Sequence, residues 1–296
     1  MYLILPNSTE VSLGITDANF LLALSALLLV LARSPRGLYG RLFDCFIWIL
    51  CGLSGPFCIF LMPISVFLAW KQRDRRRTVP VIILTGCCLI QAWALLVLAP
   101  TARSHRPFGS SPGLFARILG GRVYLGVLLG GNGLASRPGL WVSGFLACVA
   151  VGGTAIIAVC LAKSPLAMRV FLLFSALLFV SSLIDPVEWG RPDLPVWTVL
   201  AGSPGHRYWF FATLAFAWAL LWGFHSRITP VRVVASAHLC LMYIGILRVW
   251  RHPAIKETHL AECVRRFDAA PRGAVVTIQE YPDGWSLNLV KHTSTR

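Results

Sequence analysis

The sequence predicts an all-α transmembrane helix bundle of about 7–8 membrane segments, followed by a small α+β tail outside the membrane. The chain is 56% hydrophobic and only 13% charged, whereas soluble domains carry ~25% charged residues. Long apolar stretches alternate with arginine-rich breaks, and most approach the ~20 residues that a helix needs to cross ~30 Å of hydrocarbon. These observations exclude a soluble globular protein. The expected spans are residues 17–32, 43–70, 80–99, 140–162, 166–184, 208–224 and 231–249.

The net charge of +15 indicates membrane topology and not nucleic-acid binding. The arginines lie mostly in short connections between spans, where they set orientation and meet anionic lipid headgroups. The densest basic run, 71–77, is expected in the cytoplasm, and alternation places 163–169 and 225–232 on the same side. The segments then expected outside are 101–138, 185–207 and the tail after Trp250.

The long apolar segment 43–70 conflicts with a single crossing. A second basic cluster, 33–41, precedes it, and one crossing would place this cluster opposite the run 71–77. The sequence Gly-Leu-Ser-Gly-Pro at 52–56 interrupts the segment with residues that weaken a helix. Either two half-helices meet at this break and return both clusters to the cytoplasm, or the segment is one long, kinked and tilted helix. A broken helix requires protein or a water cavity around its freed carbonyls, so the break is also a candidate site.

The segment 113–130 mixes apolar residues and five glycines with Arg117 and Arg122. Because the two arginines are too central for an easy span, we expect an interfacial helix or a re-entrant element against the bundle. Its alternative roles are an amphipathic surface anchor and an element that contacts substrate.

The chain is expected to form two domains, a polytopic membrane domain over 1–250 and a water-facing, periplasmic domain over 251–296. In the second, Pro253 is expected to open a helix, and residues 274–279 and 285–290 read as strands around a turn at 281–284. A single hairpin is marginal alone, so it should pack on its helix and on the outer rim of the bundle. It would serve there as a structural cap or as a substrate lid.

Few polar groups fall inside the expected spans. His238 and Gln91 are expected to bond carbonyls of neighbouring helices, and Asp17 and Asp44 to cap the helices that they begin. Eight of the nine cysteines lie in apolar segments, where cysteine behaves as a small hydrophobe. Since no Cys/His cluster, P-loop, nucleophile elbow or dinucleotide fingerprint is present, we expect neither a metal nor a cofactor, and no ATP-driven pump or classical hydrolase.

Polar and aromatic residues on the second outer segment form the candidate substrate site. Carboxylates beside an aromatic face suit carbohydrate hydroxyls, and an arginine fork suits a lipid-linked phosphate. An interfacial aromatic belt is the alternative role of Tyr208 and Trp209. The substrate-binding candidates are Asp185, Glu188, Trp189, Arg191, Arg207 and Tyr208, together with Arg117 and Arg122 of the first outer segment.

Several short segments carry a family resemblance. They are GITDANFLLA (14–23), GLSGPFCIFLMP (52–63), GHRYW (205–209) and VTIQEYPDGW (276–285) with Leu287 and Lys291. They resemble the C-terminal half of poorly characterised bacterial polytopic inner-membrane proteins whose layout is similar to GT-C glycosyltransferases. The resemblance implies many helices, a lipid-phosphate sugar donor and a catalytic carboxylate on a large outer loop near the N-terminus. This chain begins almost directly with a hydrophobic segment, as an N-terminally truncated form would, so no catalytic residue is carried over.

The leading functional hypothesis is a multi-pass protein of the bacterial inner membrane that acts in cell-envelope polysaccharide or glycolipid assembly. It would bind membrane lipid and a polyprenyl-phosphate-linked sugar at the outer face, and whether it is an enzyme is left open. The rival hypothesis is a non-enzymatic transporter or flippase with the break at 52–56 beside a central cavity, although the two halves show no internal repeat. A third is an assembly subunit whose tail docks an envelope protein.

Overall fold

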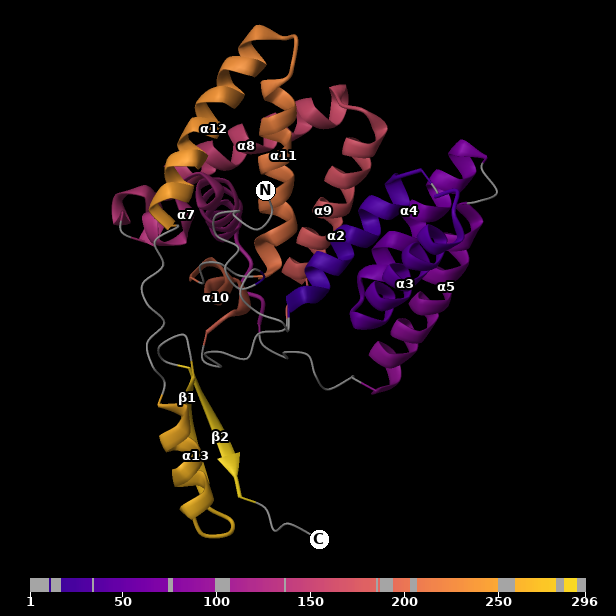
Figure 1. Cartoon of the computed structure of the whole chain (residues 1–296). Coiled ribbons are helices and arrows are strands. Elements are labelled where there is room, and N and C mark those ends of the chain that lie inside the picture. The colour runs from indigo at the N-terminus through magenta and orange to yellow at the C-terminus, as the bar shows by residue number, and fades with distance from the viewer. Residues whose placement is uncertain are drawn as a thin grey trace. The chain divides into compact units, whose positions relative to one another are not determined.

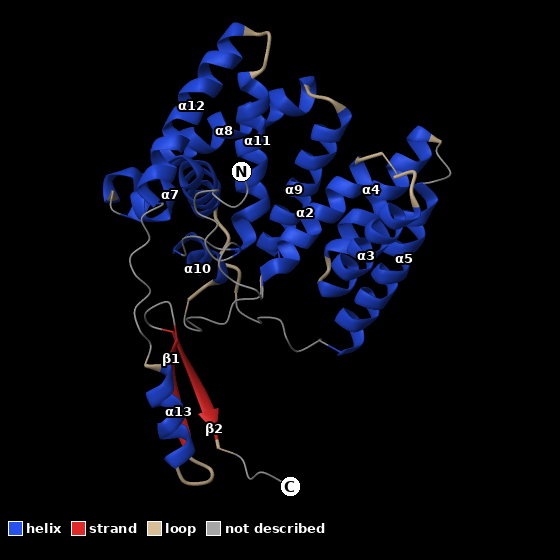
Figure 2. Ribbon diagram, viewed as in Figure 1, coloured by secondary structure: helices blue, strands red, loops and turns tan. Residues whose placement is uncertain are grey.

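The described part of the chain forms two structural units (Figures 1 and 2), Met1–Trp250 and Arg251–Arg296. A computed structural model describes residues 11, 17–33, 35–73, 77–98, 107–135, 137–184, 186, 194–202, 207–249, 259–280 and 285–291. The α-helices of the first unit are α2 (Ala18–Leu31), α3 (Leu38–Ser54), α4 (Phe57–Gln72), α5 (Thr78–Trp93), α6 (Pro112–Ala116), α7 (Gly126–Ala135), α8 (Ser143–Lys163), α9 (Leu166–Ile184), α10 (Val196–Gly202), α11 (Phe210–Phe224) and α12 (Thr229–Val249). Two π-helical segments, η4 (Ala94–Leu98) and η5 (Arg117–Leu125), and two 3-10 turns, η6 (Pro138–Trp141) and η7 (Arg207–Trp209), complete it.

The first unit is a helical bundle with membrane-length members. Five helical stretches are long and apolar enough to cross a membrane: Thr78–Val97, Pro112–Gly130, Ser143–Lys163, Leu166–Ile184 and Thr229–Arg248. Two others, α2 and α4, are apolar but shorter. The expected helical bundle with apolar helices of membrane length is confirmed, while its place in a membrane and the number of 7–8 segments stay predictions.

Helix α11 forms the centre of the core. It has only 15 residues and almost no polar side chain, and it packs against α8, α9 and α12; Figure 1 shows it between α9 and α12. Phe210, Leu214 and Leu220 are completely buried. A helix that is apolar on all sides can be enclosed by neighbouring helices without burying an unpaired polar group, which is consistent with its central position.

Helices α3 and α4 form a helical hairpin with its turn at Gly55 and Pro56. Arg77 follows α4, and its guanidinium donates to the carbonyl oxygens of Val30 (2.6 Å) and Ala32 (3.2 Å) at the end of α2. The chain leaving α4 therefore returns to the place where α3 begins. At the turn, Gln91 of α5 donates through Nε2 to the Leu53 carbonyl oxygen (2.9 Å). Of the two arrangements open for this segment, the structure has the one with two half-helices.

The hairpin brings the basic clusters to one end of the bundle. The C-terminal end of α4, the junction of α8 and α9, and the turn between α11 and α12 all lie toward the top of the bundle in Figure 1, whereas α10 lies lower. We call the end with Arg41, Lys71, Arg77, Lys163 and Arg227 the basic end. This clustering agrees with the sides assigned from the sequence by the positive-inside rule.

The hairpin predicts the sidedness of labelling in sealed membrane vesicles. In a protein whose nine cysteines are replaced, Gly37→Cys and Lys71→Cys should react with a membrane-impermeant maleimide from the same side. Gly113→Cys, at the other end, should react from the opposite side; a Cβ at Gly37 or Gly113 meets no atom within 4 Å. Labelling of positions 37 and 71 from opposite sides would contradict the hairpin.

Close contacts at glycines fix the position of the stretch Pro112–Gly130 inside the bundle. A Cβ on Gly120 would lie 2.3 Å from the Leu146 carbonyl oxygen of α8, and one on Gly245 of α12 would lie 2.2 Å from the Leu128 carbonyl oxygen. Ile118 and Val127 are completely buried. The expectation of an amphipathic surface anchor was therefore wrong, because glycines let neighbouring backbones approach this stretch on several sides.

Polar residues within the helices are held partly as expected. Gln91 bonds a neighbouring helix, as predicted, whereas His238 Nδ1 lies 2.8 Å from the Val234 carbonyl oxygen of its own helix. Asp44 was expected to cap a helix. It lies instead inside α3 and is 8% exposed, because α3 begins six residues earlier, at Leu38.

The second unit combines helix α13 (Leu260–Ala269) with the antiparallel strands β1 (Val275–Glu280) and β2 (Trp285–Val290). Thr277 pairs with Asn288 in register, and Thr277 Oγ1 donates to Asn288 Oδ1 (2.7 Å). Lys291 Nζ donates to the carbonyl oxygens of Asp268 and Ala270 at the end of α13. The predicted helix and both strands are present. The expected helix start at Pro253 and the turn at 281–284 lie outside the described residues.

Candidate functional site

An ion pair between the start of α2 and the start of α11 lies at the end of the bundle opposite the basic end. Arg207 Nη1 is 3.7 Å from Asp17 Oδ1, and the two side chains are 30% and 9% exposed. Asp17 precedes α2 but makes no capping hydrogen bond through its side chain, which corrects the capping role expected for it. A buried carboxylate needs a cationic partner, and Arg207 provides one from 190 residues along the chain.

Aromatic rings pack beneath this ion pair and join three distant segments. The Phe20 ring of α2 lies 5.1 Å from Phe57 of α4 and 6.3 Å from both Phe210 and Phe211 of α11. The segments 14–23, 52–63 and 205–209, which were singled out by their resemblance to one family, thus supply neighbouring residues. Sequence analysis chose these segments without indicating that they meet.

Asn19 adds an amide to the same place. A Cβ on Gly55, at the hairpin turn, would lie 3.5 Å from its Nδ2. Its Oδ1 is buried and accepts no hydrogen bond from any described residue. A buried acceptor without a donor is unfavourable, so this oxygen is suited to the hydroxyl group of a ligand or to a water molecule.

Arg207 and Tyr208 adopt the 3-10 turn η7 at the rim of this cluster. The Arg207 guanidinium carbon lies 5.4 Å from the centre of the Tyr208 ring, and both residues are half-buried. Trp209 is completely buried and lies 5.9 Å from Phe179 of α9. The alternative role of an interfacial aromatic belt is therefore wrong for Trp209, whose ring belongs to the core.

Arg122 and Arg117 form a second cationic group on one tryptophan. The guanidinium carbons lie 4.5 Å and 4.9 Å from the centre of the Trp141 ring. Arg122 is buried, and it donates through Nε to the Ala201 carbonyl oxygen (2.8 Å) and through Nη2 to the Gly202 carbonyl oxygen (2.6 Å). Arg117 is exposed. We therefore assign Arg122 to holding the C-terminal end of α10, in place of the phosphate contact predicted for it.

The C-terminal end of α10, which Arg122 holds, shortly precedes Arg207 in the chain. Gly202 is five residues before Arg207, so the Cα atoms of Gly202 and Arg207 are at most ~18 Å apart. The structure brings Arg117 and Arg122 together on Trp141, and it places Arg207 beside Tyr208 in η7. The other predicted substrate-binding residues, Asp185, Glu188, Trp189 and Arg191, lie outside the described residues.

Sequence analysis missed Asn19, Trp141 and Arg77. Nothing in the sequence marks the first two, because an amide and an aromatic ring next to apolar segments are common. Arg77 lay within a run expected to face headgroups, yet it is only 8% exposed. The break at 52–56 also differs from a water-lined site, since Gly52 packs directly against the Cys87 side chain.

Comparison of the chain with protein-family models, with curated proteins and with solved structures gave no match. Across the described ranges, no three His, Cys, Asp or Glu residues are grouped so that they could hold a metal ion. The candidate site therefore offers arginine side chains, one carboxylate and a cluster of phenylalanine rings for contact with a ligand. Such a combination is suited to a ligand with an anionic head and an apolar tail.

Proposed function

We propose that the protein binds a polyprenyl-phosphate-linked sugar in bacterial cell-envelope polysaccharide or glycolipid assembly. In this proposal it is a GT-C-like protein of the inner membrane, and the ligand lies at the end of the bundle that carries Asp17 and Arg207. The observation that carries the proposal is the half-exposed Arg207, which is held by a buried carboxylate above a floor of phenylalanines.

The chemistry of Arg207 supports a phosphate ligand. A guanidinium presents five N–H donors in a planar fork, so it can hold a carboxylate and a phosphate together. Asp17 and the Tyr208 ring restrict its rotamers, which lowers the entropy lost on binding. Arg117, which is exposed and stacks on Trp141, offers a further cation for an anionic ligand.

The surroundings support a polyprenyl chain and the outer leaflet. Phe20, Phe57 and Phe211 give an apolar surface beside the cationic group. The positive-inside rule assigns the basic end to the cytoplasm, and the Asp17–Arg207 pair then faces the outer side. No residue is assigned to catalysis, and the tail keeps its predicted role as a cap or a partner-docking element.

Binding of polyprenyl phosphate to the purified full-length chain tests the proposal. Arg207→Gln alone should lower the melting temperature, because it removes a cationic partner of the buried Asp17. The double variant Asp17→Asn/Arg207→Gln removes both charges and should recover most of that stability. It should still bind polyprenyl phosphate at least about tenfold more weakly, since charge-assisted hydrogen bonds contribute ~1.5–3 kcal/mol.

The matched control is Arg248→Gln, at the exposed end of α12. It removes one positive charge and should leave the affinity unchanged. Equal affinity of the wild type and of the stable double variant would contradict a phosphate site at Arg207.

A further inference from the structure

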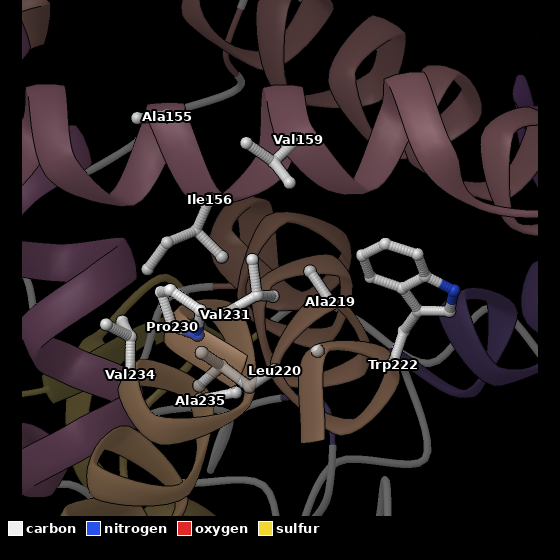
Figure 3. A pocket seen from close by; sticks show the side chains of 11 residues that line it. Ala155, Ile156, Val159, Ala219, Leu220, Trp222, Pro230, Val231, Val234 and Ala235 are labelled. Atoms are coloured by element: carbon white, nitrogen blue, oxygen red, sulfur yellow. The ribbon is translucent and has the colours of Figure 1, made fainter. Parts of the chain in front are cut away.

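An almost entirely apolar cavity lies between α8, α11 and α12, next to the turn that joins the last two helices. Its volume is about 240 Å³. Figure 3 shows Ile156 and Val159 of α8, Trp222 of α11 and Val231 of α12 around the same space. No charged side chain lines it, so a polar ligand would lose hydrogen bonds to water without replacement.

The cavity opens toward the surface that lipid covers. Leu220 forms part of its wall and is completely buried, whereas Val159 and Val234 at its rim are exposed. Because α8 and α12 are both long and apolar enough to span a membrane, exposed apolar residues on them face hydrocarbon chains. A hollow open on that side can receive an acyl chain from the bilayer.

Basic residues lie within about one helical turn of this cavity, at the basic end. Lys163 follows Val159 by four residues on α8, Arg232 adjoins Val231, and Arg227 lies in the turn before α12. All three are exposed. Within the described part of the chain, no hydrogen bond or ion pair engages their charged groups. One helical turn is ~5.4 Å, so a phosphate near these side chains would stand directly above the cavity mouth.

We propose that this region is a binding site for an anionic phospholipid of the leaflet at the basic end. The cavity holds an acyl chain, and Lys163, Arg227 and Arg232 hold the phosphate. The order of parts along the site, cationic residues outermost and an apolar cavity beneath, matches the order of a headgroup and its chain. Basic residues attract anionic lipids by ~1 kcal/mol each near a membrane surface. The site is distinct from the Asp17–Arg207 region, which lies at the other end of the bundle.

Quenching of Trp222 by brominated lipids tests the site. The full-length protein is reconstituted in phosphatidylcholine vesicles that contain a minor fraction of either phosphatidylglycerol or phosphatidylcholine with brominated acyl chains. The Trp222 signal is the difference between the wild type and Trp222→Phe. Brominated phosphatidylglycerol should quench this signal with an apparent affinity about fivefold or more above that of brominated phosphatidylcholine, which corresponds to ~1 kcal/mol.

Two pairs of variants separate the cavity from the charges. Ala155→Phe places a ring at the cavity rim and should abolish the preference, whereas Ala158→Phe, equally exposed on α8 but outside the cavity, should keep it. Arg227→Gln/Arg232→Gln should remove the preference, and Arg248→Gln should retain it. Equal quenching by both brominated lipids in the wild type would overturn the proposal, as would displacement by polyprenyl phosphate but not by unbrominated phosphatidylglycerol.

Discussion

Arg122→Ala is expected to destabilise the bundle by about 3 kcal/mol. The substitution removes the two hydrogen bonds that hold the Ala201 and Gly202 carbonyl oxygens, and these acceptors at the end of α10 lose their donor. It also removes a buried cation from the face of Trp141. The melting temperature of the detergent-solubilised protein should fall by about 8 °C, following the scaling for proteins of this size.

Arg117→Ala is the matched control for this prediction. Arg117 stacks on the same Trp141 ring but is exposed, so its removal should change the free energy of unfolding by less than about 1 kcal/mol. Arg122→Lys should fall between the two, because a single ammonium cannot reproduce the planar fork that serves two carbonyl groups. Equal losses for Arg117→Ala and Arg122→Ala would show that the hydrogen bonds to α10 contribute little.

Gly153→Ala is expected to destabilise the protein by about 2 kcal/mol through overpacking. The added Cβ would lie 2.2 Å from Tyr124 Cδ2. This ring cannot simply move aside, because its hydroxyl bonds Thr154 Oγ1 (3.1 Å) and its other neighbours include the Phe216 ring at 4.6 Å. The crossing of η5 and α8 must therefore open to admit a single methyl group.

The adjacent residue provides the control. A Cβ on Gly152 meets no atom within 4 Å, so Gly152→Ala should be neutral or should stabilise the helix by up to ~1 kcal/mol. Thermal unfolding of the two variants in the same detergent measures the difference. A loss of stability in both variants would indicate a general helix effect and not the contact with Tyr124.

The apolar pattern predicted most of the long helices but not α10, which lies in a segment expected to be a connection. The distribution of arginines predicted which helix ends lie together. The start of α3 was harder to predict from the sequence, because Leu38–Leu42 contains a glycine and an arginine, which are typical of a connection between helices. Asp44 was consequently assigned to a helix start, although it lies in the second turn. The start of α3 also involves a local contact of Gly40 with Pro35, which the apolar pattern does not display.

The candidate site was even harder to predict from the sequence, because its residues are far apart in the chain. Arg207 was identified from its own chemistry, but its partner Asp17 was assigned to capping because sequence reasoning considers a residue with its near neighbours. Arg122 was judged too polar for the interior for the same reason. Its partners are two backbone carbonyls of a helix 79 and 80 residues away, and any sequence could provide such acceptors.

The helical hairpin of α3 and α4 also has a consequence for membrane insertion. A hairpin that enters and leaves the membrane on the same side adds no net crossing. Every later helix therefore keeps the orientation that it would have if the hairpin were absent. The hairpin can therefore enter the bilayer as a pair, drawn in by its apolar arms, while the basic residues at both of its ends stay behind. Arg77 then fastens this pair to the C-terminal end of α2.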